Sequence, residues 1–154
     1  MTEKVVELYF SLMWGGKVEK VKELLDSGMD VDVILPQTAR TPIYTAINFG
    51  MLDIIEFLVS RGADVNFNDK YGEPPLLFAV AHAYPEVCRF LLQKGADPNV
   101  KDRDGNSCLD RIKEYTPRKT YRALVPVFME FEELLNDEEK KKLKKLKPRK
   151  KKEV

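Results

Sequence analysis

The segments Gly62-Ala63-Asp64-Val65-Asn66 and Gly95-Ala96-Asp97-Pro98-Asn99 decide the fold of this chain, because they repeat one pattern 33 residues apart. A third copy, Gly28-Met29-Asp30-Val31-Asp32, lies 34 residues before the first of them. Apolar residues at helical spacing, such as Ile55 and Leu58, precede each glycine. A glycine just after such a segment ends a helix, because it has no Cβ to oppose a positive φ. The sequence therefore predicts a helix and a turn in each repeat.

A second helix is predicted ahead of each of these helices. Thr41-Pro42-Ile43 places a hydroxyl at the N-cap and a proline at the first helical position, where its missing N–H costs nothing. Pro74-Pro75-Leu76 keeps the proline, and Ser107-Cys108-Leu109 keeps the hydroxyl. Tyr71-Gly72 and Asp104-Gly105 supply turn residues between repeats. The unit is thus a helix, a short turn, a second helix and a protruding turn.

This unit resembles the ankyrin repeat. Thr41-Pro42-Ile43-Tyr44-Thr45-Ala46 is similar to the Thr-Pro-Leu-His-x-Ala motif of that family, and the Gly-Ala-Asp-Val-Asn pattern is typical of it. The resemblance implies an all-α solenoid of stacked helix-turn-helix repeats with protruding turns. We expect the repeats at about residues 4–36, 37–69, 70–102 and 103–125.

Departures from the family pattern fall at the ends of the array and at one helix position. The first repeat has no Thr-Pro start and the fourth has no Gly-Ala-Asp turn, so we expect both to be terminal caps. Tyr44, Leu77 and Asp110 stand where the family has a histidine. This replacement puts in question the hydrogen bond that the histidine makes to neighbouring backbone in the family.

The segment after the fourth repeat predicts a closing helix and a charged tail. Pro117 and Pro126 break the repeat pattern. An amphipathic helix is then expected at residues 127–136, on the apolar residues Val127, Phe128, Phe131, Leu134 and Leu135. We therefore expect an ankyrin-repeat domain at residues 1–136 and a mostly basic tail at 137–154. Within the tail, the acids of 137–139 followed by lysines suit a prolonged helix or a further helical turn.

The charge of the chain is divided between an acidic body and a basic end. Residues 140–154 carry ten basic side chains and one acid, a net charge of +9, while the other 139 residues carry 16 basic and 24 acidic side chains, −8. Three roles are open for Lys140–Val154: a solvated end, a nuclear import signal, or attraction to nucleic acid or an anionic lipid surface. Because no aromatic residue lies in the segment, base stacking is not expected.

The composition argues against an enzyme and against a membrane-spanning protein. His82 is the only histidine, and Cys88 and Cys108 are the only cysteines, too few for a Cys/His zinc site or a disulfide scaffold. We expect His82 to be a surface or contact residue, both thiols to be free, and no cofactor to be used. No apolar run is long enough to cross a membrane, and the acidic start Met1–Glu7 does not suit a secretory signal. This favours a cytoplasmic protein, or a nuclear one if the chain is eukaryotic.

The residues expected to bind a partner lie where the ankyrin family, by resemblance, varies its contact surface: the turn tips and the late helix positions of the concave face. Phe49, His82 and Tyr115 form one column at a spacing of 33 residues, and a shift of 34 residues brings Trp14 into the neighbouring column of Asn48. Aromatic side chains dominate interface energetics, although Phe49 and Trp14 would also suit the interior of the stack. The expected contact residues are Trp14, Arg40, Asn48, Phe49, Lys70, Tyr71, Glu73, His82, Arg103, Asp104, Glu114 and Tyr115.

These features predict a non-enzymatic protein-binding module, which could be an adaptor, a scaffold or an inhibitor. We expect a monomer whose acidic body favours a partner with a basic surface. One alternative is a nucleic-acid-associated or nuclear factor that uses the basic tail. Another is a small bacterial immunity or effector protein, since compact ankyrin chains also occur there. The fold alone does not choose among them, because the repeat serves many unrelated partners.

Overall fold

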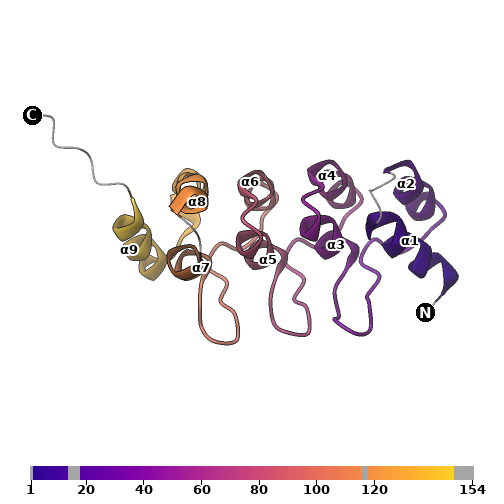
Figure 1. Cartoon of the computed structure of the whole chain (residues 1–154), viewed down its shortest axis with the longest axis horizontal. Helices are drawn as coiled ribbons and strands as arrows, with labels where there is room; N and C mark the ends of the chain where they lie inside the picture. The colour runs from indigo at the N-terminus through magenta and orange to yellow at the C-terminus, as the bar shows by residue number, and fades with distance from the viewer. Residues whose placement is uncertain (1, 14–17, 116–117, 148–154) are drawn as a thin grey trace, which may run out of the picture.

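The computed structural model describes residues 2–13, 18–115 and 118–147, whose regular elements are all helical apart from two isolated β-bridges. Eight helices form four pairs: α1 (Glu3–Met13) with α2 (Val18–Asp26), α3 (Pro42–Asn48) with α4 (Leu52–Ser60), α5 (Pro75–Ala81) with α6 (Pro85–Gln93), and α7 (Cys108–Tyr115) with α8 (Arg118–Glu130). A 3-10 turn, η1 (Glu132–Leu134), and helix α9 (Asp137–Leu146) follow. In Figure 1, α1, α3, α5 and α7 form one row, the even-numbered partners form a second, and the hairpins between repeats extend beyond the first row. The predicted all-α solenoid is confirmed.

The helix boundaries follow from residues that the repeat pattern singles out. Gly62 adopts a φ of +91° after α4, and the Ala63 N–H donates to the Leu58 carbonyl at 3.1 Å, which closes the helix end. Thr41 is extended ahead of Pro42, but its hydroxyl makes no capping hydrogen bond and is buried without a partner among the described residues. The expected hydroxyl cap is therefore wrong at Thr41, where the proline and the extended backbone begin the helix.

The fourth repeat begins its first helix by a different device. The Ser107 N–H donates to Asp110 Oδ2 at 3.0 Å, and the Asp110 N–H reaches Ser107 Oγ at 3.3 Å. This reciprocal pair satisfies two N–H groups at the start of α7. The hydroxyl cap predicted at Ser107 is thus confirmed.

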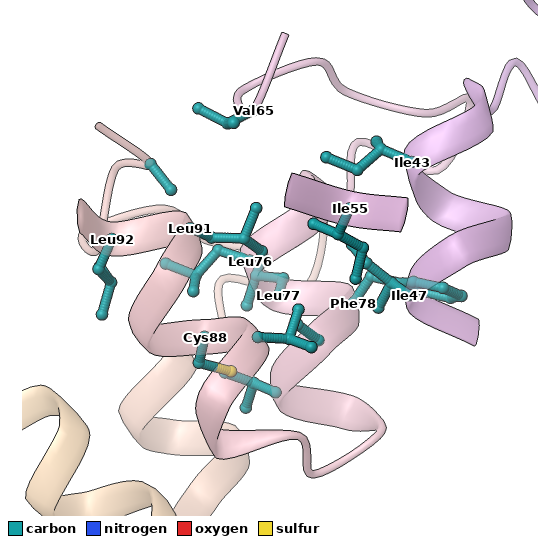
Figure 2. Packing of buried hydrophobic residues seen from close by; sticks show 14 of the residues in the cluster. Ile43, Ile47, Ile55, Val65, Leu76, Leu77, Phe78, Cys88, Leu91 and Leu92 are labelled. Carbon is teal, nitrogen blue, oxygen red and sulfur yellow. The ribbon is translucent and has the colours of Figure 1, made fainter. Parts of the chain in front are cut away.

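A single apolar core runs through the stack, because each helix buries one face against its own pair and the next. Figure 2 shows Ile47 of α3 beside Phe78 of α5, with Ile43, Leu77, Cys88 and Leu91 in the same cluster. All of these side chains except Phe78 are essentially inaccessible to solvent, and Phe78 is buried as well. The burial of apolar surface between neighbours is what makes each repeat depend on the next.

The Gly-Ala-Asp-Val-Asn turns also join successive repeats through their last residue. Asp32 accepts a hydrogen bond from the Asp64 N–H, and Asn66 Oδ1 accepts one from the Asp97 N–H at 2.9 Å. Asn99 Oδ1 accepts the equivalent bond from the Asn136 N–H at 2.7 Å. Asn136 thus takes the place of the aspartate that the fourth repeat lacks.

Two tyrosines make the hydrogen bond to neighbouring backbone that the sequence put in question. The Tyr44 hydroxyl lies within hydrogen-bond distance of the Phe67 carbonyl, at the end of its own repeat, and of the Glu73 carbonyl in the next repeat. Tyr9 of α1 lies at 3.0 Å from the Val33 carbonyl and 2.9 Å from that of Arg40. The tyrosine therefore replaces the histidine of the family motif in function. Tyr9 and Tyr44 are equivalent residues of the first two repeats and lie 35 residues apart, whereas a shift of 34 residues aligns Trp14 with Asn48.

The C-terminal region departs from the boundaries expected from sequence. Val127 and Phe128 belong to α8, the second helix of the fourth repeat, so residues 127–136 do not form a separate closing helix. Pro126 lies inside α8 rather than ending it, because the flanking Val125 and Val127 are buried and hold the helix on the core. Pro117, the other expected break, lies outside the described residues.

The helix that closes the stack is α9, which the sequence assigned to the tail. It packs on α7 and α8 at the end of the stack (Figure 1). Leu143 and Leu146 of α9 are buried. Asn136 caps it, because its side chain accepts a hydrogen bond from the Glu139 N–H at 2.9 Å. The expectation that residues 137–154 form only a charged tail is therefore wrong for 137–146, because two leucines among the lysines supply an apolar face.

Candidate protein-binding face

The middle of the stack presents an uncharged surface in a highly charged protein. One third of the chain (33%) is Asp, Glu, Lys or Arg, yet residues 41–52 and 74–85, which contain α3 and α5, have none of them. The corresponding segment of the fourth repeat, residues 107–118, contains five: Asp110, Arg111, Lys113, Glu114 and Arg118. Depletion of charge together with exposed aromatic side chains is characteristic of the centre of protein interfaces. We refer to Thr45, Asn48, Phe49, Ala81 and His82 as the concave strip.

Phe49 is the largest exposed side chain of the concave strip. It follows α3 directly, and 47% of its surface is accessible to solvent. The next residue, Gly50, has a φ of +63°, and a Cβ placed on it would lie 3.1 Å from the Tyr84 ring. This close approach brings the second and third repeats together below Phe49. The alternative that Phe49 is a core residue is thus wrong.

His82 links the two repeats across the concave strip. Its Nε2 lies 3.1 Å from Asn48 Oδ1, and its Nδ1 lies 2.9 Å from the Phe78 carbonyl. The ring also packs on Phe78, with centroids 4.4 Å apart, and stacks with Tyr84. These contacts hold the imidazole and the Asn48 amide in fixed positions, which suits recognition of a partner rather than proton transfer.

A pocket of about 260 Å³ lies beside Phe49, between α3 and the first hairpin. Leu35 and Thr38 contribute from the hairpin, Asn48 from α3, Phe49 from the residue after α3, and Phe78 from α5. The walls combine apolar side chains with hydroxyl groups, an amide and the Arg40 guanidinium, as in sites where a few polar groups orient an apolar ligand. The pocket extends the concave strip toward the hairpins.

Arg40 and Glu73, expected at exposed turn tips, instead join the hairpins in an ion-pair ladder. Arg40 Nε lies 3.0 Å from Asp69 Oδ2, and its Nη2 lies 3.8 Å from Glu73 Oε2. Glu73 also pairs with Arg111, whose Nη2 lies 2.9 Å from Asp102. All five side chains are largely buried. Their first role is therefore structural, because each charge neutralises the next along the stack.

The ladder changes the acidity of its members. Burial alone would raise the pKa of Asp102, but hydrogen bonds from the Asn106 N–H and from Arg111 outweigh it and hold that pKa below its usual value. The guanidinium of Arg40 also lies over the Phe78 ring, 4.4 Å from its centroid. Arg40 therefore forms one wall of the pocket, and its ion pairs and its contact with Phe78 hold the guanidinium in place.

The basic side chains of the tips bind the preceding tip. Lys70 Nζ donates to the Gln37 carbonyl, and Arg103 Nη2 donates to the Lys70 carbonyl, at the same spacing of 33 residues. Tyr71 is 49% exposed beside them, and Asp104 is exposed as well. At the tips, Tyr71 and Asp104 are therefore accessible to a partner protein, while the neighbouring Lys70 and Arg103 side chains already form hydrogen bonds within the stack.

The structure describes only one of the three remaining predicted contact side chains. Glu114 is exposed on α7, while Tyr115 ends that helix with a side chain outside the described residues. Trp14 also lies outside the described residues. The predicted ladder of Phe49, His82 and Tyr115 is thus described only for its first two members. Sequence reasoning missed Thr45 and Tyr84, although the absence of charge in residues 41–52 and 74–85 would have pointed to both segments.

Comparison with known proteins bears on what this face does. A family model described as ankyrin repeats (3 copies) matches residues 8–102, more than half of the chain. The chain belongs to the ankyrin-repeat family. Ankyrin repeats are protein-protein interaction modules, and the charge-free strip lies on two of the matched repeats.

Relatives of known name share only part of their length with this ankyrin-repeat chain. It is 39% identical over 61 residues to the ankyrin repeat-containing protein P1E11.10 of Schizosaccharomyces pombe, which covers 40% of this chain and 29% of the yeast protein. It is 34% identical over 64 residues to the 2-5A-dependent ribonuclease of Mus musculus, covering 42% of this chain and 9% of the ribonuclease. The phosphocholine transferase AnkX of Legionella pneumophila is 33% identical over 61 residues, 40% of this chain and 6% of the transferase.

The enzymes among these relatives match only through a small share of their length, and the ankyrin family is generally non-catalytic. Burial raises the pKa of the Cys88 thiol to about 12, and that of Cys108 is also raised well above its usual value by burial. Both cysteines are free and buried, as predicted.

In the part of the chain that the structure describes, no group of three or more His, Cys, Asp or Glu side chains is placed to hold a metal ion. No helix among the described residues has the length and apolar character needed to cross a membrane.

Proposed function

We propose that this protein is a non-enzymatic adaptor or inhibitor that binds a segment of a partner protein on the concave strip. The observation that carries the proposal is the absence of charged residues from both segments that form the strip, together with the exposed ring of Phe49. An exposed aromatic ring surrounded by uncharged polar groups binds by excluding water and by oriented hydrogen bonds. The adjoining pocket offers room for one partner side chain.

The partner chemistry that fits the strip is apolar and hydrogen-bonding. The expected preference for a basic partner surface has no support there, because Thr45, Asn48 and Phe49 offer no negative charge. Acidic side chains lie instead on the second row of helices, for example Asp53 and Glu56 on α4. We therefore propose a partner segment with an aromatic or aliphatic side chain beside free backbone amides, which Asn48 and Thr45 would bind.

Selection of peptide ligands tests this proposal before the natural partner is identified. A displayed library of 16-residue random peptides would be selected on the full chain, and the dissociation constants of the enriched peptides would be measured by fluorescence anisotropy. We expect apolar peptides, and we expect Phe49→Ala to weaken their binding by about 30-fold, the equivalent of about 2 kcal/mol.

The matched control is Leu134→Ala, because Leu134 is also apolar and 47% exposed but lies far along the chain, after α8. It should leave peptide affinity unchanged. Equal affinities for wild type and Phe49→Ala would contradict the proposal, as would an equal loss in the control.

A further inference from the structure

The stack ends at α9, and a pocket lies between α9 and the last repeat. Ile47 of α3 and Val80 of α5 occupy one column, 33 residues apart, and both are fully buried by the following repeat. The same column of α7 holds Lys113, which is exposed. A single helix, α9, packs on α7 where a helix pair would follow (Figure 1), and a pocket remains between the two helices.

This pocket between α7 and α9, the C-terminal pocket, has a volume of about 270 Å³. Leu109 and Leu146 form its apolar wall, and Lys113, Lys142 and Lys145 surround it together with Asp110. Leu109 and Leu146 are themselves buried, so the wall is part of the core. The pocket therefore places cationic groups around an apolar surface.

The three lysines of the pocket are not equivalent. Lys142 Nζ lies 2.7 Å from Asp110 Oδ2 and 2.8 Å from Glu139 Oε1, so its charge is compensated within the protein. Lys113 and Lys145 take part in none of the ion pairs of the described residues, and both are exposed. Lys141, which lies one helical turn before Lys145 on α9, is exposed as well. The end of the molecule thus carries uncompensated positive charge next to a body of net charge −8.

We propose that the C-terminal pocket and the lysines around it form a second docking surface, for an acidic protein segment that carries an apolar side chain. The uncompensated lysines fit carboxylates of the partner, and the leucine wall fits one apolar side chain between them. A nucleic acid would use the lysines alone and leave the leucine wall without a partner. The surface lies at the end of the stack, apart from the concave strip, so one copy of the protein can bridge two partners.

The test measures binding of labelled probes to the full chain by fluorescence anisotropy. The probes are a 12-residue peptide of glutamate and aspartate with one central leucine, the same peptide with serine in the centre, and a 12-base-pair DNA duplex. We expect the leucine peptide to bind, and replacement of leucine by serine to weaken binding about fivefold or more, because an apolar side chain is then lost from the pocket. We expect the duplex to bind more weakly than the leucine peptide at the same salt concentration.

Charge reversals locate the site. Lys113→Glu with Lys145→Glu should weaken the leucine peptide by about tenfold or more, since two attractive contacts become repulsive. The matched control, Lys4→Glu with Lys22→Glu, makes the same change in net charge on exposed lysines of α1 and α2 and should change affinity less than twofold. Replacing the four basic residues of 149–152 with serine should also leave at least half of the affinity, because every residue that lines the pocket is retained.

Three results would overturn the proposal. Equal binding of the leucine and serine peptides would show that the pocket is not used. Equal losses in the reversed and control variants would show attraction to net charge alone. Tighter binding of the duplex would assign this end of the molecule to nucleic acid instead.

Discussion

In the middle of the stack, Ile47 and Val80 occupy one column and are buried, whereas at the C-terminal end Lys113 occupies it and is exposed. A second column shows the same contrast: the Tyr44 hydroxyl donates to the Glu73 carbonyl of the next repeat, while Asp110 pairs with Lys142 of α9. Positions that are apolar or neutral where a repeat follows become charged where the stack ends. A residue that departs from the repeat pattern therefore indicates what its repeat packs against or binds: another repeat, a partner protein, or a single closing helix.

The largest loss of stability is expected when a side chain that packs α9 against the fourth repeat is removed. Leu143 is fully buried against the fourth repeat, so Leu143→Ala should lower the free energy of unfolding by about 2–5 kcal/mol in urea titrations. Leu134→Ala, at an exposed leucine, should change it by less than about 0.5 kcal/mol. If the two variants are equally stable, α9 does not belong to the folded unit.

A smaller loss is expected from the ladder that ties the middle hairpins to the fourth repeat. Arg111→Met leaves Asp102 without its guanidinium partner and leaves Glu73 with only the 3.8 Å contact to Arg40. We therefore expect a loss of about 1–3 kcal/mol. Arg89→Met is the control, because Arg89 pairs with Glu86 and Glu130 on the exposed second row. Its effect should be much smaller, since exposed ion pairs are screened by water. Equal effects would show that the ladder does not stabilise the stack.

The same region should make stability depend on pH in the acid range. Burial would raise the pKa of Asp110, but Lys142 and Ser107 outweigh it, so Asp110, like Asp102, has a folded pKa below its ordinary value. Their contribution is fully present above the ordinary Asp pKa near 3.9 and is lost as pH falls through the folded pKa values. Urea titrations from pH 6 to pH 2 should therefore show falling stability. The Asp102→Asn, Asp110→Asn double variant should show a shallower fall, and an unchanged slope would contradict this assignment.

The tyrosine that joins the second and third repeats should contribute less than any of these. Tyr44→Phe removes the hydroxyl that reaches the Phe67 and Glu73 carbonyls, and it should cost about 1 kcal/mol in unfolding free energy. Tyr71→Phe, which removes a hydroxyl from an exposed ring, should leave stability unchanged. A stable Tyr44→Phe variant would mean that backbone groups of the second hairpin find other partners.

The regular repeats could be predicted from sequence because their signals are local. Gly62 and Gly95 end helices by their own backbone freedom, and Pro42 begins one, so the boundaries of α3 to α6 follow from short segments. The C-terminal end could not be predicted in the same way. Whether Leu143 and Leu146 face water or a core depends on the end face of α7 and α8, which only the assembled stack provides.

The binding face could be predicted in part for the same reason. Column alignment identifies Phe49 and His82 as neighbours, since a period of 33 residues returns to the same side of the stack. Column alignment cannot show that Arg40 and Glu73 already form ion pairs within the protein. These two residues are about one repeat apart in sequence, and only the folded stack brings their side chains together. Charge depletion in the two helical segments is the sequence signal that column alignment leaves out.

Site-specific crosslinking tests most directly whether the middle repeats bind a partner through the concave strip. The photo-crosslinking residue p-benzoylphenylalanine would be placed at Ala81, exposed in the concave strip, in one chain and at Glu56, exposed on α4, in another. Each chain would be irradiated in extract of the source organism. We expect a discrete protein to crosslink from position 81 and not from position 56, and to be displaced by excess wild-type chain but not by excess Phe49→Ala. Crosslinking from position 56 alone, or equal displacement by both competitors, would contradict it.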